Sequence, residues 1–180
     1  FAVLMLIAAL IGLNLTKTQT AETPLAAETV DSSLPVGKEV GMRAPEFSAS
    51  LYSDKGEISL SDLRGKTVIL NFWATWCAPC RREMPYLKAL EEKFKDAQIV
   101  FLGLSVDSDK AKWEKMASSG DLTGTQLYLG TQSSFQEAYR IEGIPRFILL
   151  DKNGVIISND MSRPSEPKTA ETLNSLEGIR

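Results

Sequence analysis

Two long apolar runs, separated by one amphipathic segment, dominate the pattern of hydrophobic and polar positions along this chain. Residues 67–73 (TVILNFW) and 98–106 (QIVFLGLSV) are almost entirely apolar on both faces, which is typical of buried parallel strands. The stretch between them predicts a helix that opens at residues 77–80 and runs to about residue 95, because apolar residues recur there at helical spacing. This stripe comprises Met84, Leu87, Leu90 and Phe94. Strand, helix and strand in this order predict a right-handed βαβ unit.

Shorter segments flank this unit. Residues 47–52 and 57–60 read as two strands around a polar turn, which predicts a β-hairpin. Asp107 and Ser108 follow the second buried strand and are suited to cap a helix over about 109–118. The remaining predicted elements are a strand at 127–129, helices at 133–140 and 169–177, and an Asn-Gly hairpin of strands 146–150 and 155–158. Helices alternating with strands predict an α/β fold.

The N-terminal part has a different composition. Residues 1–15 are apolar and uncharged but shorter than the roughly 20 residues that cross a bilayer, so we expect a truncated signal peptide or membrane anchor. A buried core helix is the alternative. Residues 16–39 are rich in Thr, Ala and Glu without an apolar period, which predicts a flexible tether. A folded domain is then predicted over residues 40–180.

Charge and residue usage exclude several classes of function. The net charge of −3 gives no sign of nucleic-acid binding. The chain has no histidine and two cysteines, so it can build neither a Cys-His or Ser-His catalytic pair nor a four-ligand Cys/His zinc site. We therefore predict no metal site and no cofactor.

The two cysteines, Cys77 and Cys80, stand three residues apart at the start of the predicted helix. Such a pair can form and break a local disulfide without refolding the chain, which suits thiol–disulfide exchange. The positive end of the helix dipole favours a thiolate at Cys77, and Pro79 is tolerated in the first helical turn. A purely structural disulfide is the alternative, although so small a loop removes little entropy from the unfolded chain.

These motifs resemble a known family. The stretch NFWATWCAPC followed by RREMP, a later Gly-Ile-Pro before an apolar strand, and the Asn-Gly hairpin are similar to thioredoxin-fold proteins, in particular to the exported TlpA/ResA-like thiol–disulfide oxidoreductases. The resemblance covers about residues 40–179. It implies a central mixed sheet flanked by helices, an N-terminal β-hairpin, and a strand–helix insert between Cys80 and Pro145.

The resemblance also implies roles for individual residues. Cys77 matches an exposed nucleophilic cysteine, Cys80 a buried resolving cysteine, and Pro145 a cis-proline that faces the disulfide. The residues that we expect to contact the substrate are Trp76, Ala78, Pro79, Ile144 and Pro145.

Glu83 matches a glutamate that this branch carries near its active site, and we predict a catalytic role for it. A solvated residue on the helix face is the alternative. Asn71 stands where plain thioredoxins have a buried aspartate, so the proton-handling role of that aspartate must fall to another group.

We therefore predict an exported, membrane-tethered or signal-cleaved reductase of envelope disulfides on the extracytoplasmic face of a bacterial membrane. Its expected partners are apocytochrome c or other disulfide-bonded envelope proteins, with a membrane thiol reductase as electron donor and no nucleic acid. Two alternatives remain: a binding module that holds clients without turnover, and a thiol peroxidase. The peroxidase would need a Thr-x-x-Cys arrangement, but Ala74 stands three residues before Cys77.

Overall fold

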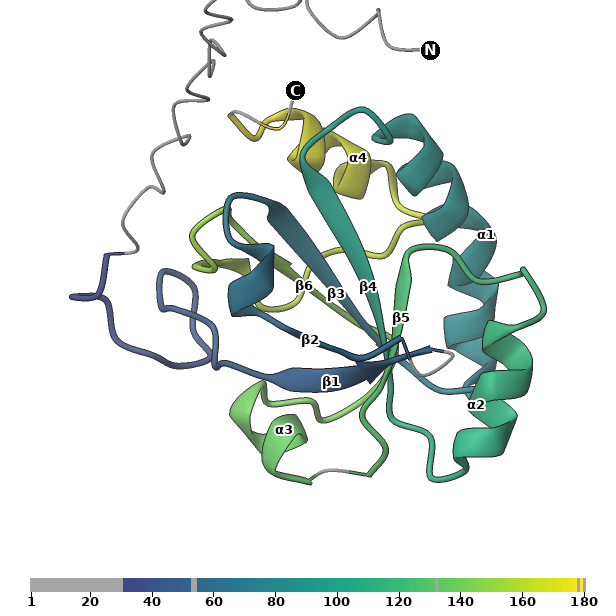
Figure 1. Ribbon diagram of the computed structural model, residues 1–180. Helices are drawn as coiled ribbons and strands as arrows, with labels where there is room; N and C mark the ends of the chain where they lie inside the picture. Colours follow the sequence, from purple (N-terminus) through teal and green to yellow (C-terminus); the bar gives the residue numbers. More distant parts are fainter. Residues whose placement is uncertain (1–30, 53–54, 132, 178, 180) are drawn as a thin grey trace, which may run out of the picture.

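The computed structural model describes residues 31–52, 55–131, 133–177 and 179, which form a mixed sheet with helices packed on it (Figure 1). The strands are β1 (Ser48–Leu51), β2 (Glu57–Ser59), β3 (Thr67–Trp73), β4 (Ile99–Ser105), β5 (Thr125–Tyr128), β6 (Arg146–Leu150) and β7 (Ile156–Ser158). The helices are a 3-10 turn, η2 (Ser61–Leu63), and α1 (Ala78–Lys93), α2 (Lys110–Ala117), α3 (Ser133–Ala138) and α4 (Pro167–Asn174). The predicted α/β class is confirmed.

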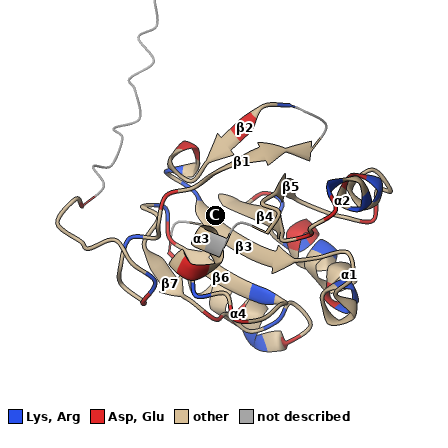
Figure 2. Ribbon diagram, turned by 90° about the horizontal axis from the view of Figure 1, so that it is seen from below, with Lys and Arg blue, Asp and Glu red and all other residues tan. Residues whose placement is uncertain are grey.

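The strand order in the sheet is β2-β1-β5-β4-β3-β6-β7. The strand β3 lies between β4, with which it runs parallel, and β6, with which it runs antiparallel. Its parallel register brings Trp73, the last residue of β3, opposite Ser105, the last residue of β4. Neither strand carries a charged residue, whereas acidic and basic residues are spread over the helices around them (Figure 2). The carboxyl ends of β3 and β4 therefore meet at one edge of an uncharged sheet centre.

Side chains on the two faces of β3 pack into two separate apolar clusters. Ile69 points into a cluster with Leu87 and Phe94 of α1 and the following turn and with Leu173 of α4. Leu70 and Phe72 belong to the other cluster, which includes the rings of Phe135 and Tyr139 from α3 and the turn after it. The alternation along the strand explains why all its residues except Thr67 and Asn71 are apolar: both faces are covered, by α1 and α4 on one side and by α3 and the turn after it on the other.

Element boundaries differ from the predicted ones by a few residues, and one capping prediction is wrong. The helix α1 begins at Ala78, because Cys77 is its N-cap residue. The N-cap of α2 is Asp109, whose side chain accepts a hydrogen bond from the Lys112 amide, and not Asp107 or Ser108. The Asp107 carboxylate is buried and bound elsewhere, as described below.

Between Cys80 and Pro145, where we expected the family's strand–helix insert, the chain forms most of α1 and then β4, α2, β5 and α3. The strand β5 starts two residues earlier than predicted and pairs parallel with β4. The indole of Trp113 in α2 is buried between the rings of Tyr52 and Tyr128, which fastens α2 to the hairpin and to β5.

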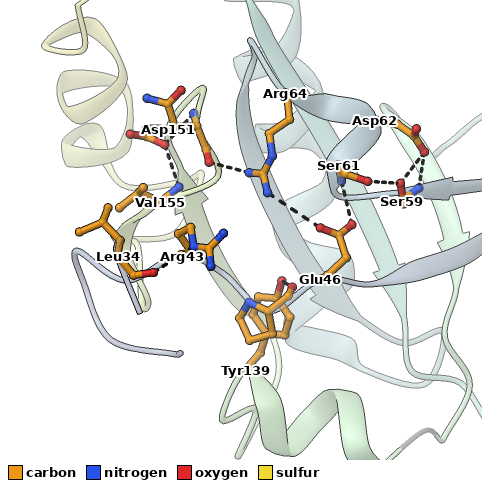
Figure 3. Close-up of polar contacts among 12 residues, drawn as sticks. Leu34, Arg43, Glu46, Ser59, Ser61, Asp62, Arg64, Tyr139, Asp151 and Val155 are labelled. Atoms are coloured by element: carbon orange, nitrogen blue, oxygen red, sulfur yellow. Dashed lines mark hydrogen bonds and ion pairs between the residues drawn. The ribbon is translucent and has the colours of Figure 1, made fainter. Parts of the chain in front are cut away.

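A polar network joins the N-terminal part of the domain to the turn between β6 and β7 (Figure 3). The Arg64 guanidinium donates to the Asn153 carbonyl at 2.6 Å and lies 3.9 Å from the Glu46 carboxylate. It also fills the space beside Gly154, where a Cβ would come within 1.6 Å of its Nη1 atom. Glycine at position 154 is favoured by its positive φ of 72°, and a Cβ there would in addition displace the Arg64 guanidinium.

The predicted N-terminal segment over residues 1–15, and the predicted tether as far as residue 30, lie outside the described residues. The described end of the tether contacts the domain: Gly37 donates to the Arg43 carbonyl at 2.9 Å, and the Arg43 guanidinium donates to the Leu34 carbonyl at 3.0 Å. Within the described part of the chain, no helix combines the length and apolar character needed to cross a membrane.

Burial of one carboxylate generates a prediction about stability. Burial raises the pKa of Glu91 above its ordinary value of 4.5, although a hydrogen bond from the Gly124 amide partly opposes this, and no residue in the described part of the chain donates to its buried Oε2 atom. An acid whose pKa is raised by folding destabilises the fold above that pKa and not below the unfolded value. We expect Glu91→Gln to raise the melting temperature by about 1–2 °C at pH 7 and to lose this gain below about pH 4.5.

Differential scanning calorimetry at pH 7 and pH 4 measures this effect. Glu92→Gln is the matched control, because it removes an equal charge from an exposed neighbour in the same helix. Its ion pair with Lys95 is exposed and should contribute little. A lower melting temperature for Glu91→Gln at pH 7 would contradict the sign of the effect.

Candidate active site at the junction of β3 and α1

The turn from β3 into α1 holds both cysteines. Its residues 74–77 are closed by a hydrogen bond from the Cys77 amide to the Ala74 carbonyl at 3.1 Å. Cys77 then caps the helix, since its Sγ atom accepts from the Cys80 amide at 3.2 Å. Pro79 occupies the first helical turn, as the sequence predicts. The Cys77 sulfur therefore lies at the positive end of α1, where free N–H groups favour negative charge.

Cys77 and Cys80 form a disulfide with a Cα–Cα distance of 5.3 Å, and no other cysteine exists in the chain. The expectation of an exposed Cys77 beside a buried Cys80 is wrong for this disulfide state, because both residues are 3% exposed. The sulfur of Cys77 is covered from the neighbouring loop: its Sγ atom lies 3.8 Å from the Ile144 carbonyl oxygen. Both cysteines also belong to the apolar cluster that contains Trp73 and Met84.

The peptide bond between Ile144 and Pro145 is cis, as predicted. This loop leads directly into β6, which pairs with β3, so it lies beside the turn that carries the cysteines. The five residues predicted to contact substrate are all partly or fully exposed around the disulfide. Trp76 is the most open of them, with 67% of its surface exposed, whereas Trp73 is buried in the core as expected.

Glu83 is buried, with only 7% of its surface exposed, so it does not lie on a solvated helix face. Its two carboxylate oxygens accept hydrogen bonds from the amide and the hydroxyl of Ser165, each at 3.0 Å. Ser165 belongs to the loop between β7 and α4, so this contact ties the first half of α1 to a segment 82 residues away in the sequence. The sequence offers no signal for Ser165, which lies in a short polar loop.

A second buried carboxylate lies behind the turn. Asp107, 1% exposed, accepts hydrogen bonds from the Thr75 amide, from the Thr75 hydroxyl at 2.6 Å and from the Ser105 hydroxyl at 2.8 Å. Sequence reasoning assigned Asp107 to a helix cap instead. Its position just after β4 could have indicated this contact, because parallel neighbouring strands end at the same edge of a sheet.

Two features set the electrostatic surroundings of the turn: the buried Asp107 carboxylate and the positive N-terminal end of α1. Burial, followed by the charges of Asp107 and Asp109, raises the pKa of the Tyr128 phenol on β5. Arg81 and Arg82 are exposed in the first turns of α1.

Among the described residues, no three or more His, Cys, Asp or Glu side chains are grouped closely enough to hold a metal ion. The chemistry available at the site is the reversible two-electron conversion of a dithiol to a disulfide.

Comparison with known proteins gives a consistent result. Residues 39–176 match the Redoxin family model. The thiol-disulfide oxidoreductase ResA of Geobacillus kaustophilus is 38% identical over 138 residues, which cover 74% of this chain and 78% of ResA.

Two solved structures from Bacteroides vulgatus are also similar. A solution structure of a candidate thiol-disulfide oxidoreductase is 51% identical, with a TM-score of 0.68 over 75% of this chain and 88% of that one. The thioredoxin domain of a thiol-disulfide oxidoreductase is 29% identical, with a TM-score of 0.68 over 76% and 96% of the two chains. The architecture described above is therefore the thioredoxin fold, with the hairpin β1–β2 added at its N-terminal side.

The geometry predicts which sulfur reacts first. Cys77 is the N-cap residue of α1 and lies beside the partly exposed Ile144 loop, while Cys80 lies within the first turn of α1. We expect iodoacetamide to modify Cys77 at least about tenfold faster than Cys80, because the thiolate is the reacting form. Peptide mapping of partially alkylated protein measures the ratio. Preferential labelling of Cys80 would reverse the order, and Cys77→Ser and Cys80→Ser give the two reference rates.

Proposed function

Because this chain belongs to the Redoxin family and is a thiol–disulfide oxidoreductase of the ResA type, we propose that it reduces disulfides of exported proteins through Cys77 and Cys80. The observation that carries the proposal is the Cys77–Cys80 pair at the N-terminus of α1, set against the cis peptide of Ile144 and Pro145.

The proposed cycle begins with the reduced protein. The Cys77 thiolate attacks one sulfur of the substrate disulfide, forms a mixed disulfide and releases the other substrate sulfur as a thiolate. The Cys80 thiolate then attacks the Cys77 sulfur, which releases the second substrate thiolate and leaves the Cys77–Cys80 disulfide. Two electrons pass to the substrate, whose two sulfurs take up two protons. A dithiol donor restores the reduced pair by the reverse exchange.

The surroundings of Cys77 support docking of an extended substrate. The Ile144 carbonyl is adjacent to the Cys77 sulfur, and the backbone of a loop at this place can pair with a peptide strand. The exposed Trp76, with Ala78 and Pro79, offers apolar surface on the residues that adjoin Cys77 in the chain. Aromatic residues of this kind contribute strongly at protein interfaces.

Glu83 is proposed as the group that accepts the Cys80 proton when the mixed disulfide is resolved. It stands one helical turn after Cys80, and the chain contains no histidine that could serve instead. A carboxylate has about four acceptor positions, and Ser165 occupies two of them. The remaining positions can receive a proton directly or through one water molecule, while Ser165 holds the carboxylate in place.

We further propose that the protein acts as a reductant and that it does so outside the cytoplasm. The Ala-Pro dipeptide between the cysteines lacks the histidine of strongly oxidising Cys-Pro-His-Cys sites, which favours a reductant. The apolar residues 1–15 and the polar segment after them are suited to export and tethering. Disulfide-bonded envelope proteins such as apocytochrome c are then the proposed substrates, with a membrane thiol reductase as the donor.

Reduction of insulin tests the activity. With dithiothreitol as electron source, catalytic amounts of the protein should accelerate insulin precipitation over many turnovers, and Cys77→Ser should abolish the acceleration. Cys80→Ser should instead accumulate a mixed disulfide that reducing agents release. A protein that binds one insulin chain per molecule and stops there would be a binding module. Consumption of hydrogen peroxide at a rate above that of insulin reduction would indicate a peroxidase.

The role of Glu83 gives a separate prediction. Glu83→Gln should slow resolution of a preformed mixed disulfide by about 10²-fold, because an amide cannot accept the Cys80 proton. Formation of the mixed disulfide at Cys77 should change far less. Stopped-flow mixing measures both steps, with Glu92→Gln as the control for charge on the same helix. A resolution rate within about twofold of wild type would remove Glu83 from the mechanism, since loss of a general base costs far more.

A further inference from the structure

The turn that carries Cys77 is held by the side chain of Asp107, which stands two residues after the end of the neighbouring strand β4. Thr75, two residues before Cys77, gives both its amide and its hydroxyl to Asp107, at 2.9 and 2.6 Å. Asp107 in turn accepts from the Ser105 hydroxyl at 2.8 Å and donates its own amide to the same Ser105 oxygen at 3.2 Å. Every partner of the carboxylate is a donor, which suits an acceptor-only group.

This contact is well placed to fix the turn. At this edge of the sheet, the backbone hydrogen bonds between β3 and the end of β4 finish with one from the Val106 amide to the Trp73 carbonyl at 2.9 Å. Beyond it, residues 74–77 form no strand, and Thr75 is only half-buried. The bonds to Asp107 therefore extend the attachment of β3 to β4 past the end of the sheet. Hydrogen bonds that involve an ionised group are stronger than neutral ones, and Asp107 is 1% exposed.

We propose that Asp107 is a positioning residue for thiol exchange: through Thr75 it holds the turn so that the Cys77 sulfur faces the Ile144 carbonyl. A peptide that pairs with the backbone at Ile144 then has its disulfide sulfur in line with Cys77. The proposal rests on thiol exchange at Cys77 and not on the direction of electron flow or on the client. A displacement of reacting atoms by about 1 Å can reduce a rate by about 10²-fold, so a loosened turn should be measurable.

Two isosteric substitutions separate position from charge. Thr75→Val removes the hydroxyl donor and leaves the Asp107 charge in place. Asp107→Asn removes the charge and leaves one acceptor oxygen for the three donors that the carboxylate now serves. Thr75→Ser keeps the hydroxyl and is the conservative rescue. Asp109→Asn is the charge control, because this exposed aspartate caps α2 and asparagine caps helices equally well.

Two activated disulfides with a common leaving group read out the position of Cys77. One is dithiobis(nitrobenzoate), and the other is an extended ten-residue peptide whose single cysteine carries thionitrobenzoate. Reduced full-length protein releases the same coloured thiol from both, so the ratio of the two rate constants reports how well Cys77 meets a docked peptide. We expect Thr75→Val and Asp107→Asn to lower the ratio of peptide rate to small-molecule rate by about tenfold, and Thr75→Ser to restore it to within about twofold.

Several results would overturn the proposal. An unchanged ratio in Thr75→Val would do so even if Asp107→Asn failed to fold. An effect in Asp107→Asn without one in Thr75→Val would assign the effect to charge. A parallel loss with both probes, accompanied by a lower melting temperature, would make the contact merely structural. A wild type without preference for the peptide would also contradict it. Absence of insulin turnover, by contrast, would refute the proposed reductase alone, because the activated probes react with any accessible thiolate at Cys77.

Discussion

Parallel pairing between β3 and β4 is the constraint on which the site depends. The two strands run in register from Thr67 opposite Ile99 to Trp73 opposite Ser105, so the segments that follow them leave the sheet at the same edge. Uncharged side chains on both faces of β3 allow the strand to be buried at the centre of the sheet. The turn with Cys77 and the loop with Asp107 are therefore neighbours by necessity. The antiparallel strand β6 adds the Ile144 loop from the other side.

The fold was predictable where a pattern was long and locally determined. The strands β3 and β6 and the apolar stripe of α1 follow from burial alone, and the cysteine spacing indicated the disulfide at the helix start. The resemblance of the motifs supplied the cis peptide at Pro145, which periodicity could not have given. Short elements were predicted with shifted ends. The bounds of β5 follow from its pairing with β4, whereas α4 begins at Pro167, a local start signal that the apolar spacing does not include.

The site was less predictable because its polar contacts are tertiary. A single sequence cannot show that Ser165 reaches Glu83 across 82 residues. Asp107 was assigned to a cap because aspartate after a strand often starts a helix, but Asp109 performs that function two residues later. The buried state of Cys77 also depends on the Ile144 loop, which no local pattern places above the sulfur. The sequence thus identifies the reactive residues but does not predict the tertiary contacts that surround them.

Coverage of both sulfurs has a consequence for selectivity among reductants. Thiol exchange requires the incoming sulfur to approach along the axis of the bond that it breaks, and a disulfide whose cysteines are 3% exposed offers few such approaches. A small thiol in solution meets the rim of the turn far more often than it meets sulfur. A macromolecule that packs against Trp76 and displaces the Ile144 loop can bring its own thiol to the Cys77 sulfur. A small thiol therefore reduces this disulfide more slowly than it reduces an exposed one and must be present in excess, whereas a thiol on a surface that fits the site needs no such excess.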